Sequence, residues 1–177
     1  MKLVILDRDG VINFDSPDYI KSPGEWRPVP GSLEAIALLA QNGWRVVVAT
    51  NQSGIARGLF DMATLNAIHA KMHKAVNHAG GRIEAVFYCP DLPGMDCTCR
   101  KPRPGMLISI GERFNVPLER VPAVGDKLSD LQAARAVGAR PILVLTGDGK
   151  ATRANGGLPE DTQIFPDLFS VAQALVQ

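Results

Sequence analysis

Short apolar runs alternate with longer stretches of helical periodicity along this chain. Leu3–Leu6 is an uninterrupted apolar run, which is typical of a strand buried on both faces. Four further apolar runs, rich in β-branched and aromatic residues, also predict strands. They are Trp44–Asn51, Ala85–Cys89, Val121–Asp126 and Pro141–Gly147.

Helices are predicted between these strands. Ser32–Gln41 precedes an Asn-Gly stop, and a longer helix begins after Asp61, a capping residue, and ends before Gly80. Two more helices are expected near Gly105–Phe114 and over Leu168–Val176. Apolar residues fall on one face of the long helix, as a helix that packs against a sheet requires.

A helix is also predicted directly after Asp126, because Ser129 and Gln132 match a capping box. Strands that alternate with helices imply right-handed crossovers and a doubly wound, mostly parallel sheet. We find no internal repeat and no convincing domain boundary. We therefore expect one α/β domain over residues 1–177, with a long loop at Ser16–Gly31.

Four polar clusters follow predicted strands or the loops after them. They are Asp7-Asp9, Thr50-Asn51, Arg100-Lys101 and Asp126. Ligands of open parallel sheets bind beyond the carboxyl ends of the strands, so the four clusters are expected to form one site.

A carboxylate pair at this edge suits phosphate-ester chemistry. A carboxylate that attacks a phosphate dianion meets repulsion of about 4 kcal/mol per charge pair at close range. A hard cation such as Mg²⁺ would remove it, held by Asp7, Asp126 and a backbone carbonyl near Asp9. Lys101 and the Thr50 hydroxyl could contact the transferring oxygens. One aspartate would serve as nucleophile and the other as general acid and base.

Composition and charge narrow the function further. The chain is 46% hydrophobic with a net charge of +1, which disfavours broad capture of nucleic acid. We expect no membrane insertion and a cytoplasmic location, because no segment reads as a signal peptide or a membrane span. We also expect a monomer. Three cysteines, Cys89, Cys97 and Cys99, cluster in one loop, which favours metal binding over disulfides.

Four motifs in sequence order resemble those of haloacid dehalogenase-type phosphatases: DRDG at 7–10, TNQ at 50–52, CRKPRPG at 99–105 and GDKLSD at 125–130. Within that family, TNQSGIARG and CRKP are similar to the branch that removes the 7-phosphate of D-glycero-D-manno-heptose 1,7-bisphosphate, a step toward ADP-heptose and the lipopolysaccharide core. The resemblance implies a Rossmann-like sheet, a minimal cap and a small sugar bisphosphate as substrate.

The resemblance also implies a role for each matching residue. Asp7 would be the nucleophile, Asp9 the acid and base, and Asp126 a Mg²⁺ ligand together with Asp7 and Asp9. Thr50 and Lys101 would stabilise the phosphoryl group. The residues expected to contact substrate are Asn51, Gln52, Ser53, Arg100 and Lys127.

A structural zinc is a further implication of the resemblance. Cys89, Cys97 and Cys99 match a Cys-x-His…Cys-x-Cys pattern, but Asp91 stands in place of the histidine. Because aspartate can bind zinc, a Cys₃Asp site is expected. Such a site would hold the Arg100-Lys101 pair that follows it.

Three other functions compete with this one. A histidinol-phosphate phosphatase has a similarly short spacing between its cysteines. A nucleic-acid 3′-phosphatase uses a similar aspartate pair. A non-catalytic binding protein would lack the nucleophile or a metal-binding aspartate, and this chain retains both. Outside the site, we expect His69 and His73 on a solvated helix face, Thr146–Lys150 as a loop, and Trp26 as a packing residue.

Overall fold

Six parallel strands form the sheet of the computed structural model, which describes all 177 residues. Their spatial order is β3-β2-β1-β4-β5-β6. The bounds are β1 (Lys2–Leu6), β2 (Trp44–Asn51), β3 (Ala85–Cys89), β4 (Pro122–Gly125), β5 (Arg140–Val144) and β6 (Gln163–Phe165). The parallel, doubly wound sheet expected from the alternation of elements is confirmed.

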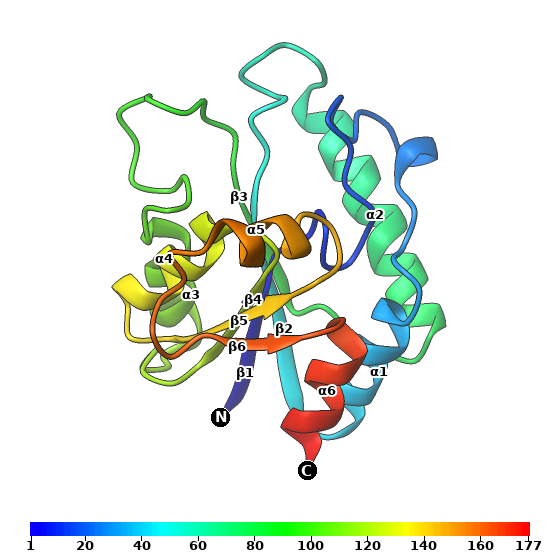
Figure 1. The fold of residues 1–177 in the computed structure, drawn as a ribbon. Coiled ribbons are helices and arrows are strands. Elements are labelled where there is room, and N and C mark those ends of the chain that lie inside the picture. The colour runs from blue at the N-terminus through cyan, green and yellow to red at the C-terminus, as the bar shows by residue number, and fades with distance from the viewer.

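Helices cover both faces of the sheet (Figure 1). One face carries α1 (Ser32–Gln41), α2 (Met62–His78) and α6 (Leu168–Val176), and the other carries α3 (Gly105–Phe114) and α4 (Leu128–Ala136). The short η1 (Pro23–Glu25) contacts α2, and α5 (Gly149–Asn155) lies beyond the carboxyl ends of the strands.

The central strand β1 explains why its sequence is apolar without alternation. Val4 and Leu6 belong to the core under α1, α2 and α6, whereas Leu3 and Ile5 belong to the core under α3 and α4. All four side chains are buried. A strand covered by helices on both sides has no solvent-facing position for a polar residue.

The strand order reverses direction at β1 and β4. β1 pairs with β2 on one side and with β4 on the other, and Leu6 lies opposite Val124 in the register. The Asp7 amide continues this ladder by donating to the Val124 carbonyl at 2.9 Å. The connections that follow β1 and β4 therefore run to opposite sides of the sheet. This divergence opens a crevice between them at the carboxyl edge.

Three local predictions differ from the structure. The helix after Asp126 begins at Leu128 with Lys127 as its capping residue, and Asp130, in place of Gln132, closes the box by accepting from the Lys127 amide at 3.1 Å. The stretch Thr146–Lys150 is only partly loop, because α5 begins within it. β6, an exposed edge strand of three residues, was not predicted.

No helix of the chain is both long and apolar enough to cross a bilayer. The segment between β1 and α1 contains only η1, and no further sheet or helical bundle is inserted anywhere along the chain. The loops that rise beyond the strands therefore surround the carboxyl edge without a separate cap, as Figure 1 shows.

Candidate active site

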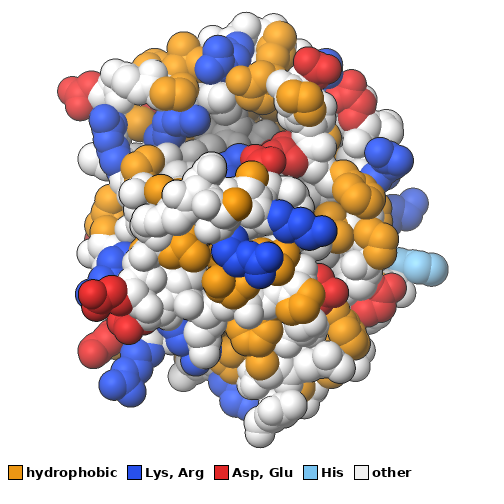
Figure 2. All heavy atoms as spheres, in the orientation of Figure 1, with side chains coloured by type: hydrophobic (Ala, Val, Ile, Leu, Met, Phe, Trp, Pro, Cys, Tyr) orange, Lys and Arg blue, Asp and Glu red, His pale blue; other side chains and the backbone are white.

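A polar cavity of about 570 Å³ opens at the carboxyl edge of the sheet. Only one of its 18 lining residues is hydrophobic, so it suits a charged and hydroxylated ligand better than an apolar one. Figure 2 shows a hollow in the upper part of one face, with acidic and basic side chains inside it. The cavity is lined by Asp7 and Asp9 from the end of β1 and by residues from the loops after β2, β3 and β4.

Asp7 lies at the floor of the cavity beside a buried lysine. The Lys101 ammonium is 3.1 Å from Asp7 Oδ1 and 2.6 Å from Asp130 Oδ1, and it donates to the Ala49 carbonyl at 2.8 Å. All three charged side chains are more than nine-tenths buried. Although burial opposes its charge, Asp130 and Asp7 hold the pKa of Lys101 above its ordinary value.

Asp126 follows β4 and is completely buried. Its Oδ2 accepts from the Asp148 amide at 2.9 Å, but its Oδ1 has no hydrogen-bond partner. Two glycines make room for this carboxylate: a Cβ on Gly10 would lie 2.1 Å from Oδ2, and one on Gly147 would lie 2.3 Å from it. A buried oxygen without a donor is costly unless a cation approaches it.

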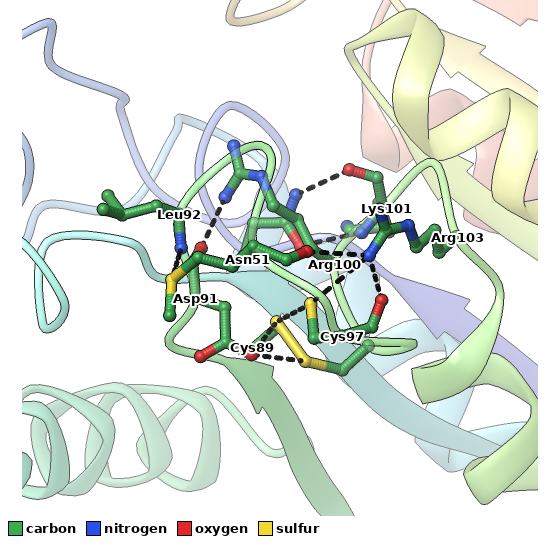
Figure 3. The surroundings of a disulfide bond; sticks show 10 residues. Asn51, Cys89, Asp91, Leu92, Cys97, Arg100, Lys101 and Arg103 are labelled. Carbon is green, nitrogen blue, oxygen red and sulfur yellow. Dashed lines mark hydrogen bonds between the residues drawn. A yellow bond between two sulfur atoms is a disulfide. The ribbon is translucent and has the colours of Figure 1, made fainter.

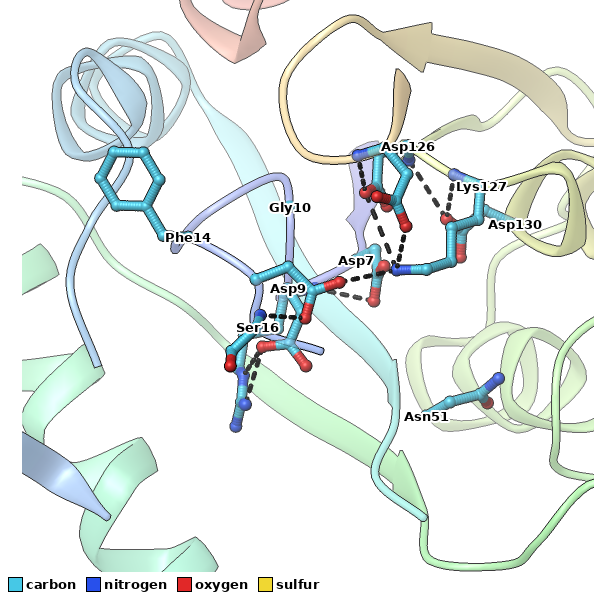
Figure 4. Close-up of polar contacts among 12 residues, drawn as sticks. Asp7, Asp9, Gly10, Phe14, Ser16, Asn51, Asp126, Lys127 and Asp130 are labelled. Carbon is cyan, nitrogen blue, oxygen red and sulfur yellow. Dashed lines mark hydrogen bonds and ion pairs between the residues drawn. The ribbon is translucent and has the colours of Figure 1, made fainter. Parts of the chain in front are cut away.

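The three carboxylates Asp7, Asp126 and Asp130 offer oxygens that lie within 4.8 Å of one another (Figure 4). Burial and the neighbouring Asp130 raise the pKa of Asp7 to about 7. Burial and Asp7 raise the pKa of Asp126 to about 8. Three carboxylates face only two ammonium groups, those of Lys101 and Lys127, so negative charge exceeds positive charge here. Hard oxygen donors with excess negative charge fit Mg²⁺.

Asp9 lines the same cavity in a different environment. Its Oδ1 accepts from Arg8 Nε at 3.0 Å, from Arg8 Nη2 at 2.8 Å and from Asn13 Nδ2 at 2.9 Å. Its Oδ2 accepts only from Gln52 Nε2, at 3.2 Å. Burial opposes ionisation, but the Arg8 charge and the donated hydrogen bonds outweigh it and lower the pKa of Asp9. The Asp9 carboxylate is not part of the acidic cluster.

Asn51 joins the loop after β2 to the loop after β3. Its Nδ2 donates to the Lys101 carbonyl at 3.2 Å, and its Oδ1 accepts from the Lys101 amide at 3.1 Å. Thr50 is buried and does not line the cavity; its hydroxyl accepts from Gln52 Nε2 at 2.9 Å. The structure therefore places Thr50 beneath the floor and uses Asn51 to hold the backbone that carries Lys101.

The remaining predicted substrate residues lie around the rim. Lys127 Nζ is 3.0 Å from Asp15 and 3.5 Å from Asp148, and it lies 3.8 Å from Asp126. Arg100 Nη1 donates to the Asp91 carbonyl at 3.1 Å. Ser53, Gln52, Arg100 and Lys127 all line the cavity. Four further polar lining residues were not predicted from the sequence to belong to the site: Asp15, Tyr19, Arg57 and Asp148. Ser129, predicted only as a capping residue, lines the cavity as well.

The cysteine loop departs from the prediction that it would avoid a disulfide. Cys89 and Cys99 are bonded, and Cys97 is free (Figure 3). One ligand atom from each of Cys89, Asp91, Cys97 and Cys99 still lies within 4.8 Å of the others. Thiols close enough to share a metal are also close enough to bond to each other, and the sequence spacing alone does not separate the two states.

Two further residues, Asp130 and His69, were not predicted from the sequence to belong to the site. Asp130 was quoted within GDKLSD, but only the fold shows that it contacts Lys101 and also accepts from the Asp126 amide at 3.2 Å. The prediction that His69 lies on a solvated helix face is wrong, because His69 is buried and its Nε2 is 3.1 Å from Arg8 Nη1. The lysines beside it suggested exposure, but helix α2 turns this position toward β1.

Comparisons with known proteins agree with this geometry. The family model described as HAD-hydrolase-like matches residues 98–171, and that of polynucleotide kinase 3 phosphatase matches residues 4–132. A D-glycero-beta-D-manno-heptose-1,7-bisphosphate 7-phosphatase of Bordetella bronchiseptica is 59% identical over 100% of this chain and 99% of its own. The enzyme of the same name from Pseudomonas aeruginosa is 56% identical over 99% and 98%.

The chain belongs to the heptose 1,7-bisphosphate 7-phosphatase family. A crystal structure of the B. bronchiseptica enzyme complexed with magnesium and phosphate has a TM-score of 0.98 and covers 100% of this chain and 99% of its own, at 59% identity. The Burkholderia thailandensis enzyme has a TM-score of 0.81 at 54% identity, with coverages of 100% and 99%. Phosphatases of this family are hydrolases, and the fold and family inferred from the four motifs are confirmed.

Proposed function

We propose that this chain hydrolyses the 7-phosphate of D-glycero-β-D-manno-heptose 1,7-bisphosphate. The observation that carries the proposal is full-length identity above 50% to enzymes of that name, on a chain whose own acidic cluster, Lys101 and Asp9 meet in one polar cavity. The open cavity without a cap domain leaves room for the distal part of a sugar bisphosphate. We also propose that residues 1–177 act as one domain, since all six strands form a single sheet.

The acidic cluster fits a Mg²⁺ ion. Asp7 and Asp126 would hold it through carboxylate oxygens, Asp126 with the buried Oδ1 that has no partner, and Asp9 would add its main-chain carbonyl. When bound, Mg²⁺ neutralises the phosphate oxygens and the excess carboxylate charge. Asp130 remains paired with Lys101 and so keeps that ammonium aimed at Asp7.

The chain's own side chains then supply the covalent chemistry. An Asp7 oxygen attacks phosphorus and forms an aspartyl-phosphate, while the bond from phosphorus to the sugar oxygen breaks. Asp9, which is ionised in the free protein, takes up a proton from solvent as the phosphate ester binds and gives it to the departing sugar alkoxide. As a carboxylate, Asp9 then takes a proton from the water that hydrolyses the intermediate, which frees Asp7 and leaves Asp9 protonated as it was in the substrate complex. Lys101 stays beside Asp7 and stabilises the transferring oxygens.

A side-by-side kinetic assay tests the substrate. Heptose 1,7-bisphosphate and histidinol phosphate are compared by kcat/KM, which measures discrimination directly. We expect the heptose bisphosphate to be preferred by at least about 100-fold. A preference for histidinol phosphate would overturn the substrate proposal and leave the mechanism intact.

A nucleic-acid 3′-phosphatase is the second candidate, because residues 4–132 match the polynucleotide kinase 3 phosphatase model. We expect no such activity, because the net charge is +1 and a phosphate-backbone binder needs an excess of basic residues. Release of phosphate from a 3′-phosphorylated oligonucleotide at low salt, faster than from the sugar bisphosphate, would favour this candidate.

We further propose that the cysteine loop binds zinc when its thiols are reduced, as in the cytoplasm, where we expect this chain to act. The four ligand atoms of Cys89, Asp91, Cys97 and Cys99 are close enough for one tetrahedral ion. The Cys89–Cys99 disulfide and a bound zinc exclude each other, since both need the same sulfurs.

Metal analysis tests the zinc proposal. Protein prepared with reductant should carry about one zinc per chain, and Asp91→His should retain it more tightly than the unchanged protein does. Asp96→Ala, an exposed change in the same loop, is the matched control. A reduced protein without zinc would overturn this proposal.

A further inference from the structure

A fully buried arginine lies directly behind the acid/base aspartate. Arg8 has no exposed surface, although it lies between the two aspartates in the sequence. Burying a guanidinium is costly unless its donors are satisfied. Its Nε and Nη2 both donate to Asp9 Oδ1, and its Nη1 lies 3.1 Å from His69 Nε2.

The hydrogen bonds decide which oxygen of Asp9 can carry a proton. Oδ1 already accepts three hydrogen bonds, two from Arg8 and one from Asn13, so no site remains there for a proton. Oδ2 accepts only one, from Gln52 at 3.2 Å. The proton that Asp9 gives to a leaving group must therefore reside on Oδ2, and the orientation of that oxygen depends on how Oδ1 is held.

His69 holds Arg8 from the other side. Arginine donates and never accepts, so Nε2 of His69 accepts the Nη1 proton and the imidazole carries its own proton on Nδ1. Burial and the Arg8 charge lower the pKa of His69 to about 4, so the ring stays neutral and able to accept at neutral pH. His69 lies in the middle of α2, whose packing against the core gives it a fixed position.

We propose that Arg8 and His69 are positioning residues for leaving-group protonation: His69 on α2 holds the Arg8 guanidinium, and Arg8 holds Asp9 so that Oδ2 points its proton into the cavity. This inference rests on the proposed phosphatase function. Neither residue touches substrate, since neither lines the cavity, and both act through Asp9.

The test compares two substrates whose leaving groups differ in their need for a proton donor. A sugar alkoxide is a poor leaving group and needs Asp9 as an acid, whereas the nitrophenolate of p-nitrophenyl phosphate leaves without help. The comparison uses kcat/KM, because it covers only the steps up to release of the alcohol and excludes the later hydrolysis of the aspartyl-phosphate. His69→Phe keeps a ring at the position but removes the acceptor, and His69→Gln restores an acceptor.

We expect His69→Phe to lower kcat/KM for the sugar phosphate about tenfold and that for p-nitrophenyl phosphate less than about twofold. His69→Gln should recover most of the loss. His73→Leu, one helical turn along α2 and without a hydrogen bond to Arg8 or Asp9, is the matched control and should leave both values unchanged. Should His69→Phe fail to fold, His69→Leu makes the same comparison.

Equal losses on both substrates, no loss on either, or a His69→Gln variant as impaired as His69→Phe would overturn the inference. These outcomes differ from failure of the proposed function, in which the unchanged protein itself would not hydrolyse the sugar phosphate.

Discussion

Asp7 and Asp9 are two residues apart and line one cavity, but their surroundings favour opposite protonation states. Asp7 shares its space with Asp126 and Asp130 and has one bonded cation, Lys101. Asp9 lies outside that group and is paired with Arg8. Burial together with Asp130 raises the pKa of Asp7, whereas the Arg8 charge, working against burial, lowers that of Asp9.

Neighbouring charges therefore assign different roles to two residues of the same type. A carboxylate among carboxylates needs an added cation to ionise fully, which prepares Asp7 for a metal and a phosphate. A carboxylate held by a fixed guanidinium keeps its geometry with or without a metal. The two regions should therefore respond differently to substitution, to metal and to pH.

The largest expected effect is that of Asp7→Asn. Without the carboxylate no covalent intermediate forms, so we expect phosphate release to fall by at least about 10⁴-fold. The metal-free protein should be at least as stable as before, because repulsion with Asp126 and Asp130 is relieved. Phosphate release and thermal unfolding check both parts, with the exposed Asp18→Asn as control. A variant that still turned over would contradict the assignment of the nucleophile.

Asp9→Asn should have a smaller effect on rate but a larger cost in stability. Loss of the acid and base is expected to slow turnover by about 10²- to 10⁴-fold. Breaking the buried pair leaves the Arg8 charge unneutralised, which costs about 3 kcal/mol of unfolding free energy. Denaturant titration of this variant beside Asp7→Asn tests the contrast, and equal stabilities of the two variants would remove it.

Asp130→Asn should lower activity by about 10- to 100-fold through its effect on Lys101. The substitution removes the charge that lies 2.6 Å from the ammonium, so Lys101 loses one of its two carboxylate partners. Steady-state kinetics with Asp161→Asn, an exposed carboxylate in a surface ion pair, give the comparison. An unchanged kcat would show that Asp7 alone suffices to place Lys101.

The smallest expected effect is a pH dependence of stability. The pKa of Asp7 is raised to about 7 and that of Asp126 to about 8, so the folded metal-free protein binds more protons than the unfolded chain. Unfolding free energy should therefore fall as pH rises from 6.5 to 8.5, by on the order of 2 kcal/mol. Asp9, with its lowered pKa, is ionised throughout and adds no slope.

Denaturation at several pH values, with EDTA or with Mg²⁺, measures this slope. Mg²⁺ binds the ionised carboxylates, so it should flatten or reverse the trend. A slope that is the same in both conditions would mean that the acidic cluster is not the metal site.

The strand and helix pattern was largely readable because it depends on local burial. The apolar run of β1 and the cap at Asp61 each report their own surroundings, and both elements lie where the pattern placed them. The short edge strand β6 was missed because three residues, two of them exposed, leave no pattern of burial in the sequence. The helix α5 was missed because it begins at Gly149, and glycine is not typical of a helix start. The structure requires glycine there, because a Cβ would clash with the Val144 carbonyl.

Within the site, the residue types at the carboxyl ends of β1, β2 and β4 could be read from the sequence, because a parallel sheet brings those ends to one edge whatever the loops do. Their partners could not be read in this way and follow from the folded arrangement: Arg8 contacts His69, Thr50 accepts from Gln52, Asp130 pairs with Lys101, and Cys89 is bonded to Cys99. Partners depend on side-chain direction and on contacts between distant elements such as β1 and α2. A local sequence pattern contains no information about either of these. The contacts between distant elements are also what give Asp7 and Asp9 different environments.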